Sequence, residues 1–377
     1  WHKSAFCDMI CVMNFGIDTF GCDHGRSGLG AYLAALTEQL PSTPDIEWTL
    51  FGTEIDRYTY ASDGKKHYAA VHIKDRSFSQ KLWHIFHADS FARRQKFNAV
   101  LYPAATLFLP SLFSVPSAAV VNGLPGTLHG SIKHKLRRAA AIIAPSMFIR
   151  KKLIKYGIPK EKITVIHNGI DHSLFFRRPT EHLSAETVDI KPFAIKRPYF
   201  IYASKLTDAS KNHIELIKAF SLFKERTKLP HRLVLAGDIG AYSNAVNAAA
   251  LKSSAAHDIF ITGYFPHESL PDLYAASDAC FVPSTNEGIG LTVLEAMATG
   301  VPVACANAGA LPEMTGGNAL LFDADSIEDI ADAMEKITRD EKNRQKMIEE
   351  GLKWAKRFNW QNTAAETCAI LQNIATP

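Results

Sequence analysis

Two glutamates eight positions apart, Glu287 and Glu295, flank a glycine-containing turn in residues 281–309, which read FVPSTNEGIGLTVLEAMATGVPVACANAG. An apolar run precedes Glu287, Gly288 and Gly290 follow it, and a helix-length segment carries Glu295. Glycines let the main chain approach a phosphate closely, and a helix N-terminus adds unpaired N–H groups and a partial positive charge. We therefore predict that this turn binds a diphosphate.

The two carboxylates have different expected roles. Glu287 precedes the helix and would accept hydrogen bonds from hydroxyl groups beside the anion. Glu295 lies at least one turn into the helix, where it would reach a vicinal diol such as a ribose. An anion site combined with a polyol site indicates a nucleotide sugar. The alternative is that Glu287 is a solvated acid near a helix cap and that Glu295 is an ordinary helix residue.

Two lysines in a second segment carry charge that suits a diphosphate. In YASKLTDASKNHIELIKAF, residues 202–220, Lys205 comes just after an apolar run and Lys211 just before a helix-length segment. Fixed ammonium groups there would neutralise a diphosphate and stabilise the negative charge that grows on it as a sugar leaves. The alternative is that both are ordinary surface lysines.

Apolar runs alternate with helix-length segments along both halves of the chain, which predicts parallel sheets covered by helices. The runs are residues 9–15, 48–51, 99–102, 118–121, 141–144 and 163–166, then 199–203, 233–236, 259–262, 280–282 and 301–305. A polar, proline-containing segment near residues 175–197 is predicted to be an irregular linker.

The predicted fold class is therefore α/β, with two doubly wound, Rossmann-like domains, because 377 residues exceed the size at which one core keeps growing. Open parallel sheets bind ligands beyond the carboxyl ends of their strands. We expect the chemistry there, in a cleft between the domains.

The Glu-Gly-x-Gly-Leu core and the spacing of the two glutamates resemble the Glu-x7-Glu signature of the retaining GT-B glycosyltransferases of family four. The resemblance is strongest over residues 198–331. It implies a GT-B architecture, in which two Rossmann-like domains face a central cleft. It also implies an acceptor-binding domain over residues 1–180, a nucleotide-sugar donor domain over residues 181–358, and a helix over residues 359–377 that crosses back to the first domain.

In the site that the resemblance implies, Glu287 orients the sugar and Glu295 holds the ribose. The other donor-binding residues of the turn are Gly288, Ile289, Gly290, Leu291 and Thr292. Ile289 and Thr292 stand where the family usually has Phe and Pro.

The two lysines match the family's Gly-Arg-Leu followed by Lys-Gly, with Lys205 where arginine is usual. A lysine keeps the charge but loses bidentate geometry, so Lys211 is the stronger candidate. The predicted catalytic residues are Glu287, Lys205 and Lys211.

Two further donor contacts follow from the resemblance. Gly28, in HGRSGLGAYLAALTEQL, would bring a backbone N–H to the donor phosphate, and a plain tight turn is the alternative. A dinucleotide site is rejected there, because Leu33 occupies the position of the third glycine. Gly263 and Tyr264 would lie near the nucleobase.

The acceptor candidates are Asn122 and His129. Both lie in VVNGLPGTLHG, residues 120–130, where the family often has a histidine directly after a strand. This chain has Asn122 at that position, and His129 comes seven residues later. A structural role for His129 is the alternative.

We predict no metal site and no cofactor. Asp323 and Asp325 form an Asp-x-Asp pair that would suit Mg²⁺ or Mn²⁺, but Asp325 and Ser326 precede a helix and are expected to cap it. The six cysteines include no CxxC pair, and several fall in apolar runs, where a thiol acts as a small buried hydrophobe.

The charge is uneven: residues 1–180 carry a net +10 and the remainder a net −6. Basic clusters at residues 93–96, 133–138 and 150–155 would meet an anionic membrane surface or a phosphate-bearing acceptor, unless they are solvated helix faces. No apolar run is long enough to span a bilayer, and residues 1–16 are interpreted as a first strand rather than a signal peptide. We expect a cytoplasmic protein, peripheral to the membrane, with no nucleic-acid partner.

The expected activity is retaining transfer of a hexose to an acceptor hydroxyl in polysaccharide or glycolipid assembly. The resemblance implies a UDP-sugar donor, with GDP-mannose possible, and front-face attack in which the leaving phosphate oxygen takes the acceptor proton. A glycan or a lipid-linked molecule would be the acceptor. Two other classes stay open: a nucleotide-sugar epimerase of similar shape, and a non-catalytic sugar-nucleotide binding protein.

Overall fold

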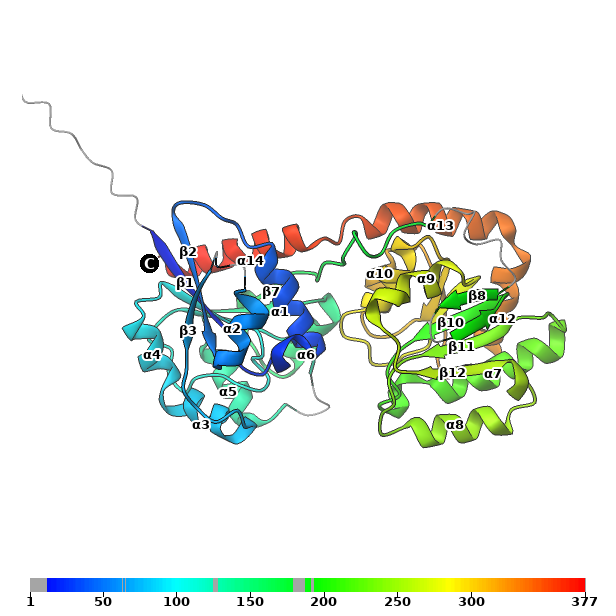
Figure 1. Cartoon of the computed structure of the whole chain (residues 1–377), viewed down its shortest axis with the longest axis horizontal. Coiled ribbons are helices and arrows are strands. Elements are labelled where there is room, and N and C mark those ends of the chain that lie inside the picture. The colour runs from blue at the N-terminus through cyan, green and yellow to red at the C-terminus, as the bar shows by residue number, and fades with distance from the viewer. Residues whose placement is uncertain are drawn as a thin grey trace, which may run out of the picture. The chain divides into compact units, whose positions relative to one another are not determined.

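The computed structural model describes residues 12–62, 64, 66–124, 128–178, 187–190 and 193–376. The chain divides into two compact units. Unit 1 comprises Trp1–Gly169 and Trp360–Pro377, and unit 2 comprises Ile170–Asn359. Each unit contains a parallel sheet with helices beside it, so the predicted α/β fold class is confirmed (Figure 1).

The sheet of unit 1 has seven strands in the order β3-β2-β1-β4-β5-β6-β7, and every pair is parallel. Its strands are β1 (Met13–Asp18), β2 (Ile46–Gly52), β3 (His67–Ala70), β4 (Ala99–Tyr102), β5 (Ser117–Val120), β6 (Ala141–Ala144) and β7 (Ile163–Val165). Its helices are α1 (Gly28–Glu38), α2 (Glu54–Tyr60), α3 (Ser77–Phe86), α4 (Ala88–Arg94), α5 (Gly130–Arg138), α6 (Met147–Lys155) and α14 (Trp360–Ala375).

Helices bury both faces of this sheet, which is why strands such as β4 and β6 are apolar at every position. All four residues of β4 and all four of β6 are buried. Side chains of α1 and α14 share one core cluster with the sheet, and those of α3, α4, α5 and α6 share another.

The helix α14 belongs to the core of unit 1, although the chain leaves this unit at residue 169. The ring of Trp360 lies 5.7 Å from that of Tyr32 on α1, and the Thr363 hydroxyl donates to the carbonyl of His167 at 2.8 Å. Leu371 is fully buried in the cluster with α1 and β1.

The sheet of unit 2 has six parallel strands in the order β12-β11-β10-β13-β14-β15. Its strands are β10 (Tyr199–Ala203), β11 (Arg232–Ala236), β12 (Ile259–Gly263), β13 (Ala279–Val282), β14 (Val303–Ala306) and β15 (Leu320–Phe322). Its helices are α7 (His213–Thr227), α8 (Ser243–Lys252), α9 (Leu270–Ala275), α10 (Leu291–Ala298), α11 (Leu311–Thr315), α12 (Ile327–Arg339) and α13 (Glu341–Ala355).

Four strands and one predicted apolar run differ from the sequence prediction. The segment predicted as an irregular linker contains an antiparallel pair, β8 (Thr187–Ile190) and β9 (Phe193–Lys196), whose β-branched residues favour strands. The strands β3 and β15 were also missed, because four and three residues give too short a pattern to recognise. Most of the predicted run at residues 9–15 precedes β1, and residues 1–11 lie outside the described part.

Candidate functional site

The order of strands in unit 2 locates the point at which the topology reverses. From β10 the chain proceeds outward to β11 and β12, and it then returns to place β13 on the other side of β10. Ligands of open α/β sheets bind at the carboxyl ends of the strands at such a point. Lys205 and Lys211 follow β10, and Glu287 follows β13. The sequence motifs therefore meet where this fold binds ligands.

Lys211 and Glu287 form an ion pair there. The Lys211 Nζ donates to Glu287 Oε2 at 2.8 Å, and the two side chains are 24% and 22% exposed. The backbones are joined as well, because the N–H of Thr285 donates to the carbonyl of Ser210 at 2.9 Å. Two predicted catalytic residues, 76 positions apart, thus form one unit.

Two glycines fix the backbone around Glu287. Gly290 precedes α10 with a φ of +77°, and a Cβ there would lie 2.8 Å from the Met314 side chain. Gly309 has a φ of +64°, and a Cβ there would lie 2.5 Å from the Glu287 carbonyl oxygen. The same carbonyl accepts from the N–H of Ala310 at 2.8 Å. Gly309, which sequence reasoning did not single out, is therefore required for the position of Glu287.

The N-terminus of α10 carries the rest of the predicted turn. Leu291 is the first residue of the helix, and Gly288 and Ile289 are partly buried before it. The N–H of Gly290 donates to Glu287 Oε1 at 3.4 Å, and the Thr292 hydroxyl donates to the carbonyl of Ala203 at the end of β10 at 3.4 Å. Both contacts are long, but they tie the turn to the pair described above.

Glu295 lies on α10, where it is partly accessible to water. Burial raises the pKa of Glu295 from its ordinary 4.5 to about 7, and the Tyr274 hydroxyl partly offsets this rise. Tyr274 is itself fully buried. A carboxyl group that titrates near neutral pH is typical of a functional site.

Lys211 is held by a tight turn before α7. Asp208 accepts from the N–H of Ser210 at 3.0 Å and from its hydroxyl, and the hydroxyl hydrogen bond holds the pKa of Asp208 below its usual value. Asn212 has a φ of +52°, and its Nδ2 donates to the carbonyl of Ala324 at 3.1 Å. A left-handed conformation at Asn212 accounts for the glycine that the family usually has there.

Lys205 is exposed, and in the described part of the chain no carboxylate lies within ion-pair distance of it. Its backbone packs against the loop after β11. A Cβ at Gly237 would collide with the Ser204 carbonyl, and one at Gly240 would collide with that of Leu206. The sequence analysis did not single out Gly237 and Gly240, which lie in AGDIG, residues 236–240. The position of Gly237 directly after a strand could have indicated a close backbone contact.

Gly263 ends β12 with a φ of +68°, and its carbonyl accepts from the N–H of Gly237 at 3.3 Å. The next side chain, Tyr264, is 70% exposed. A free aromatic ring at the carboxyl end of a strand is available for stacking on a planar base.

Gly28 lies in unit 1, as the first residue of α1, and is exposed. The loop before it is anchored by His24, whose Nδ1 lies 2.7 Å from Asp56 Oδ1 and whose Nε2 lies 3.0 Å from Asp75 Oδ2. Although burial opposes its charge, these hydrogen bonds raise the pKa of His24. The contact of Gly28 with a donor phosphate stays a prediction.

Asn122 and His129 also lie in unit 1. Asn122 follows β5, and its side-chain nitrogen and oxygen are both buried with no hydrogen-bond partner among the described residues. His129 is exposed directly before α5. Between them, residues 125–127 lie outside the described part. Two buried, unsatisfied amide atoms are costly, and they make Asn122 the stronger acceptor candidate.

The Asp-x-Asp segment caps a helix only in part. Ser326 is the capping residue of α12, and its hydroxyl accepts from the N–H of Asp329 at 3.1 Å. Asp325 was expected to share this role, but the side chain that accepts at the N-cap is that of Ser326. The N–H of Asp325 donates to Asp323 Oδ1 at 3.0 Å. Among the residues that the structure describes, no three His, Cys, Asp or Glu side chains are arranged to hold a metal ion.

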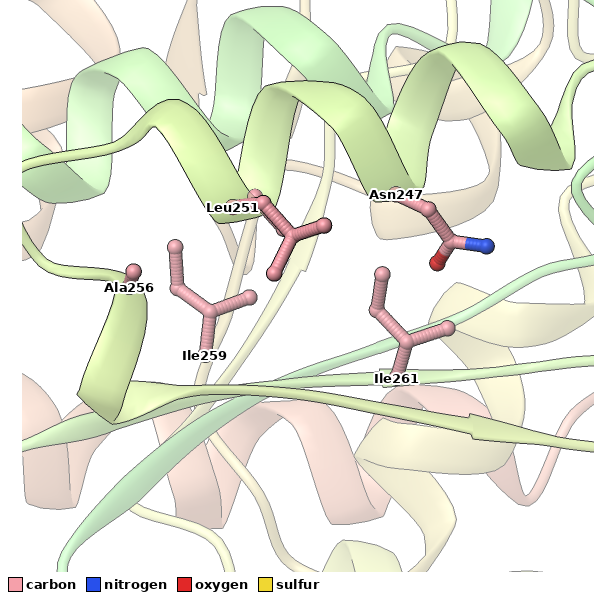
Figure 2. A pocket seen from close by; sticks show the side chains of 6 residues that line it. Asn247, Leu251, Ala256, Ile259 and Ile261 are labelled. Atoms are coloured by element: carbon pink, nitrogen blue, oxygen red, sulfur yellow. The ribbon is translucent and has the colours of Figure 1, made fainter.

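A separate apolar hollow lies between α8 and β12 (Figure 2). Its lining residues are Asn247, Ala250, Leu251, Ala256, Ile259 and Ile261. None of the predicted site residues is among them.

Family models match most of the chain. The one described as "Glycosyl transferases group 1" matches residues 185–354, and the one described as "Glycosyltransferase Family 4" matches residues 26–174. The chain belongs to the family four glycosyltransferases. The predicted family is thereby confirmed, and the first match contains both glutamates and both lysines of the site.

This glycosyltransferase is similar to the O-antigen chain mannosyltransferase B of Escherichia coli, with 26% identity over 97% of this chain and 88% of the relative. It is also similar to the D-inositol 3-phosphate glycosyltransferase of Corynebacterium urealyticum, with 26% identity over 59% of this chain and 53% of that protein.

A solved structure, Anabaena HepE in complex with UDP and glucose, has a TM-score of 0.71 and 17% identity over 96% of this chain and 100% of that one. This likeness confirms the GT-B fold of the glycosyltransferase. Within the described residues, no helix is both long and apolar enough to cross a bilayer.

Proposed function

We propose that this family four glycosyltransferase moves a hexose from a nucleoside diphosphate sugar to an acceptor hydroxyl, with retention of the anomeric configuration. The observation that carries the proposal is the 2.8 Å ion pair of Lys211 and Glu287 at the topological reversal of the unit 2 sheet. In this proposal the pair would supply a cation for phosphate and a carboxylate for sugar hydroxyls within one hydrogen bond of each other.

The donor would lie along the turn before α10. Glu287 would accept hydrogen bonds from the sugar, and the N–H groups of residues 288–290 would face its phosphate oxygens. Lys211 and Lys205 would balance the diphosphate charge. The hydrogen bond that Lys211 donates orients the Glu287 carboxylate, whose oxygens accept from hydroxyl groups.

The nucleoside would lie near Glu295 and Tyr264. Glu295 would accept from the two ribose hydroxyls in its ionised form, and Tyr264 would stack on the base. UDP is the favoured carrier because a protein of the same fold has been solved with UDP. GDP-mannose is the other candidate, because one relative is named a mannosyltransferase.

The chemistry would need no general base from the protein. The acceptor hydroxyl would attack the front face of the sugar, and its proton would pass to the departing phosphate oxygen. Two ammonium groups and the N-terminus of α10 would stabilise the charge that develops on the diphosphate, so we propose a metal-independent reaction. The acceptor would be a glycan or lipid-linked sugar in polysaccharide assembly, with Asn122 as its first contact.

The test is nucleotide release from a panel of UDP- and GDP-sugars, with and without acceptors. Lys211→Ala should lower kcat/KM by roughly 100- to 1000-fold, because it removes the cation from the developing charge. Lys218→Ala is the matched control, since Lys218 is an exposed lysine of α7 and should retain full activity. Equal activity of both variants would refute the assignment.

The same panel separates the other function classes. An epimerase would convert the donor sugar with no acceptor present, and a binding protein would bind the donor without releasing nucleoside diphosphate. Acceptor-dependent release, together with the anomeric configuration of the product read by NMR, would support the retaining transferase.

A further inference from the structure

The loop that joins β1 to α1 in unit 1, residues 19–27, has an uncommon backbone conformation. Asp23, His24 and Gly25 have φ angles of +49°, +50° and +86° in succession. Only glycine adopts this left-handed region readily, so the surroundings must hold the first two residues in it. Strained residues of this kind persist where a loop has to keep one shape.

The side chain of His24 ties the loop to two other segments. Its Nδ1 lies 2.7 Å from Asp56 Oδ1 on α2, and its Nε2 lies 3.0 Å from Asp75 Oδ2 between β3 and α3. Both ring nitrogens donate only in the protonated imidazolium. A neutral ring would turn one lone pair toward a carboxylate, so this geometry suits the charged form.

The two carboxylates are themselves fixed by neighbouring groups. Asp56 is buried, and its Oδ2 accepts from the hydroxyls of Thr19 at 2.8 Å and Thr53 at 3.0 Å. Asp75 Oδ1 accepts from Gln80 Nε2 on α3 at 2.7 Å. The carboxylates therefore face the imidazole ring from set positions.

The same loop packs on the first turn of α1. A Cβ at Gly30 would collide with the carbonyl of Cys22 and with the backbone of Gly25. The Ser27 hydroxyl accepts from the N–H of Gly30 at 3.1 Å. Because of these contacts, a movement of the loop would displace the start of α1.

The start of α1 is suited to an anion. In the part of the chain that the structure describes, the N–H groups of Gly28 and Leu29 have no acceptor, and a Cβ at Gly28 would face open space. The first turn carries no acidic residue. Unpaired N–H groups and the helix dipole attract phosphate, and Gly28 is the residue that the family resemblance assigns to the donor phosphate.

The charge of His24 depends on pH in the neutral to alkaline range. Burial opposes this charge, but the hydrogen bonds and negative charges of Asp56 and Asp75 raise the pKa of His24 above its ordinary 6.5. Burial raises the pKa values of nearby thiol and hydroxyl groups, which therefore stay neutral: Cys22, Tyr60 and Tyr68.

Other charged side chains near the loop have partners of their own. Arg57 pairs with Glu54 at 3.1 Å, and His84 lies 2.8 Å from Asp18. Burial raises the pKa of Asp18 from its ordinary 3.8, so the second pair has its own pH dependence. We expect it to be the same in wild type and in variants of His24, so the ratio of their activities removes it. The charged residues of the loop itself are exposed: Asp23 and Arg26.

We propose that His24, charged and bridged between Asp56 and Asp75, is a positioning residue that holds the start of α1 in place for the donor phosphate. This rests on the proposed function, because it takes a nucleoside diphosphate sugar as the donor. Protonation would then set the pH range of the transfer. The bridge is complete below pH 6.5, the ordinary pKa of histidine, and it is lost as pH rises through the raised pKa of His24.

The first test is the pH profile of kcat for the full chain, with the donor selected in the nucleotide-sugar panel. His24→Gln should lower kcat at least about tenfold below pH 6.5, because displaced N–H groups stabilise the departing diphosphate less well. The ratio of wild type to variant should fall toward one at alkaline pH, where the wild type has lost the same proton. A ratio that stays constant with pH, or equal activity throughout, would overturn the proposal.

The matched control is His67→Gln. His67 Nε2 also lies near a carboxylate, Glu47 Oε1 at 3.1 Å, but this side chain is 71% exposed and faces one acid only among the described residues. Its pH profile should be that of the wild type.

The loop is followed directly by hydrogen exchange of the free protein. His24→Gln should speed exchange over residues 19–31 at least about tenfold in the acid range, while residues 199–203 of β10 exchange as in the wild type. Unchanged protection of the loop would contradict the proposal.

Asp75→Asn tests the charge while the histidine is kept. The Asp75 side chain is 51% exposed, so the fold tolerates the change. Asparagine still offers an oxygen acceptor but no charge, so kcat should begin to fall at a lower pH than in the wild type. A purely structural role would lower Tm and leave the pH profile of kcat in place, and that result would refute the positioning role.

Lys211→Ala, assayed in parallel, separates this proposal from the proposed function. It should lose activity at every pH, and full activity would show that the donor assignment is wrong. If Lys211→Ala is inactive and His24→Gln matches the wild type, the positioning role of His24 alone is wrong.

Discussion

Glu295→Gln is expected to stabilise the protein while weakening its hold on the donor. Glu295 is buried enough to raise its pKa from 4.5 to about 7, so the folded protein disfavours its ionised form. A rise of about 2.5 units corresponds to roughly 3 kcal/mol at 1.36 kcal/mol per unit. Partial access to water makes this an upper bound.

The sign of the effect follows from the direction of the shift. Below about pH 4.5 the carboxyl group is protonated in both the folded and the unfolded state, and it does not lower the free energy of unfolding. The loss of folding stability caused by ionising Glu295 grows as pH rises from 4.5 to 7 and is constant above that range. Glutamine, which stays neutral, should therefore raise Tm by several degrees at pH 8, at roughly 2–4 °C per kcal/mol, and by little at pH 4.5.

Glu295→Gln should weaken donor binding at the high pH at which it stabilises the fold. The ionised carboxylate would accept two ribose hydroxyls, so wild-type affinity for UDP or GDP should rise between pH 6 and pH 8. Glu295→Gln should show no such rise and should bind roughly 10- to 100-fold more weakly at pH 8, the range for hydrogen bonds to a charged group.

The assay is differential scanning fluorimetry with nucleotide titration calorimetry, at pH 4.5, 6, 7 and 8. Glu328→Gln on α12, where the glutamate is exposed, is the control and should change neither quantity. The reasoning fails if the Tm gain of Glu295→Gln is the same at pH 4.5 and pH 8, or if both proteins lose affinity in parallel as pH falls.

Three further outcomes can be measured directly. Gly309→Ala should lower kcat/KM at least about tenfold by displacing Glu287, whereas Gly317→Ala, which has a similar positive φ but no atom near its Cβ, should lose stability and little activity. Asn212→Ala should destabilise the protein by about 1–2 kcal/mol in urea melts, and glycine at the same position should cost less because it accepts the left-handed backbone. Leu371→Ala should lower the stability of unit 1 by about 2–5 kcal/mol, seen as earlier hydrogen exchange in its sheet, with nucleotide affinity unchanged. Normal turnover in Gly309→Ala would disprove the role assigned to that glycine.

The parallel sheets and the turn before α10 could be predicted because their signals are local. Buried strands appear as short apolar runs, and Gly290 marks a positive φ within three residues of Glu287. The ion pair of Lys211 with Glu287 could not be predicted from periodicity, because only the strand order brings β10 and β13 together. The resemblance to the family predicts the roles of Lys211 and Glu287, and the structure shows the contact between them.

Other features were beyond a reading of the sequence for physical reasons. The pattern of α3 places its phenylalanines and leucine on one face, which by the usual rule would be the buried one. In the structure the opposite face of α3 is buried instead, because His84 contacts Asp18 at the end of β1. The two residues are 66 positions apart in the sequence. The left-handed backbone at Asn212 was likewise hidden, because asparagine adopts several conformations and only its contact with residue 324 selects this one.

The return of α14 to unit 1 has a consequence for biosynthesis. Residues 170–359 form unit 2 as one uninterrupted stretch, so this unit can fold as soon as it has left the ribosome. Unit 1 begins earlier but cannot complete its core until the last helix emerges, because Ala364, Cys368 and Leu371 fill one side of it. Nascent chains released before α14 should therefore display an exposed apolar groove over β4, β5 and β6 and depend on chaperones, although their second half is already folded.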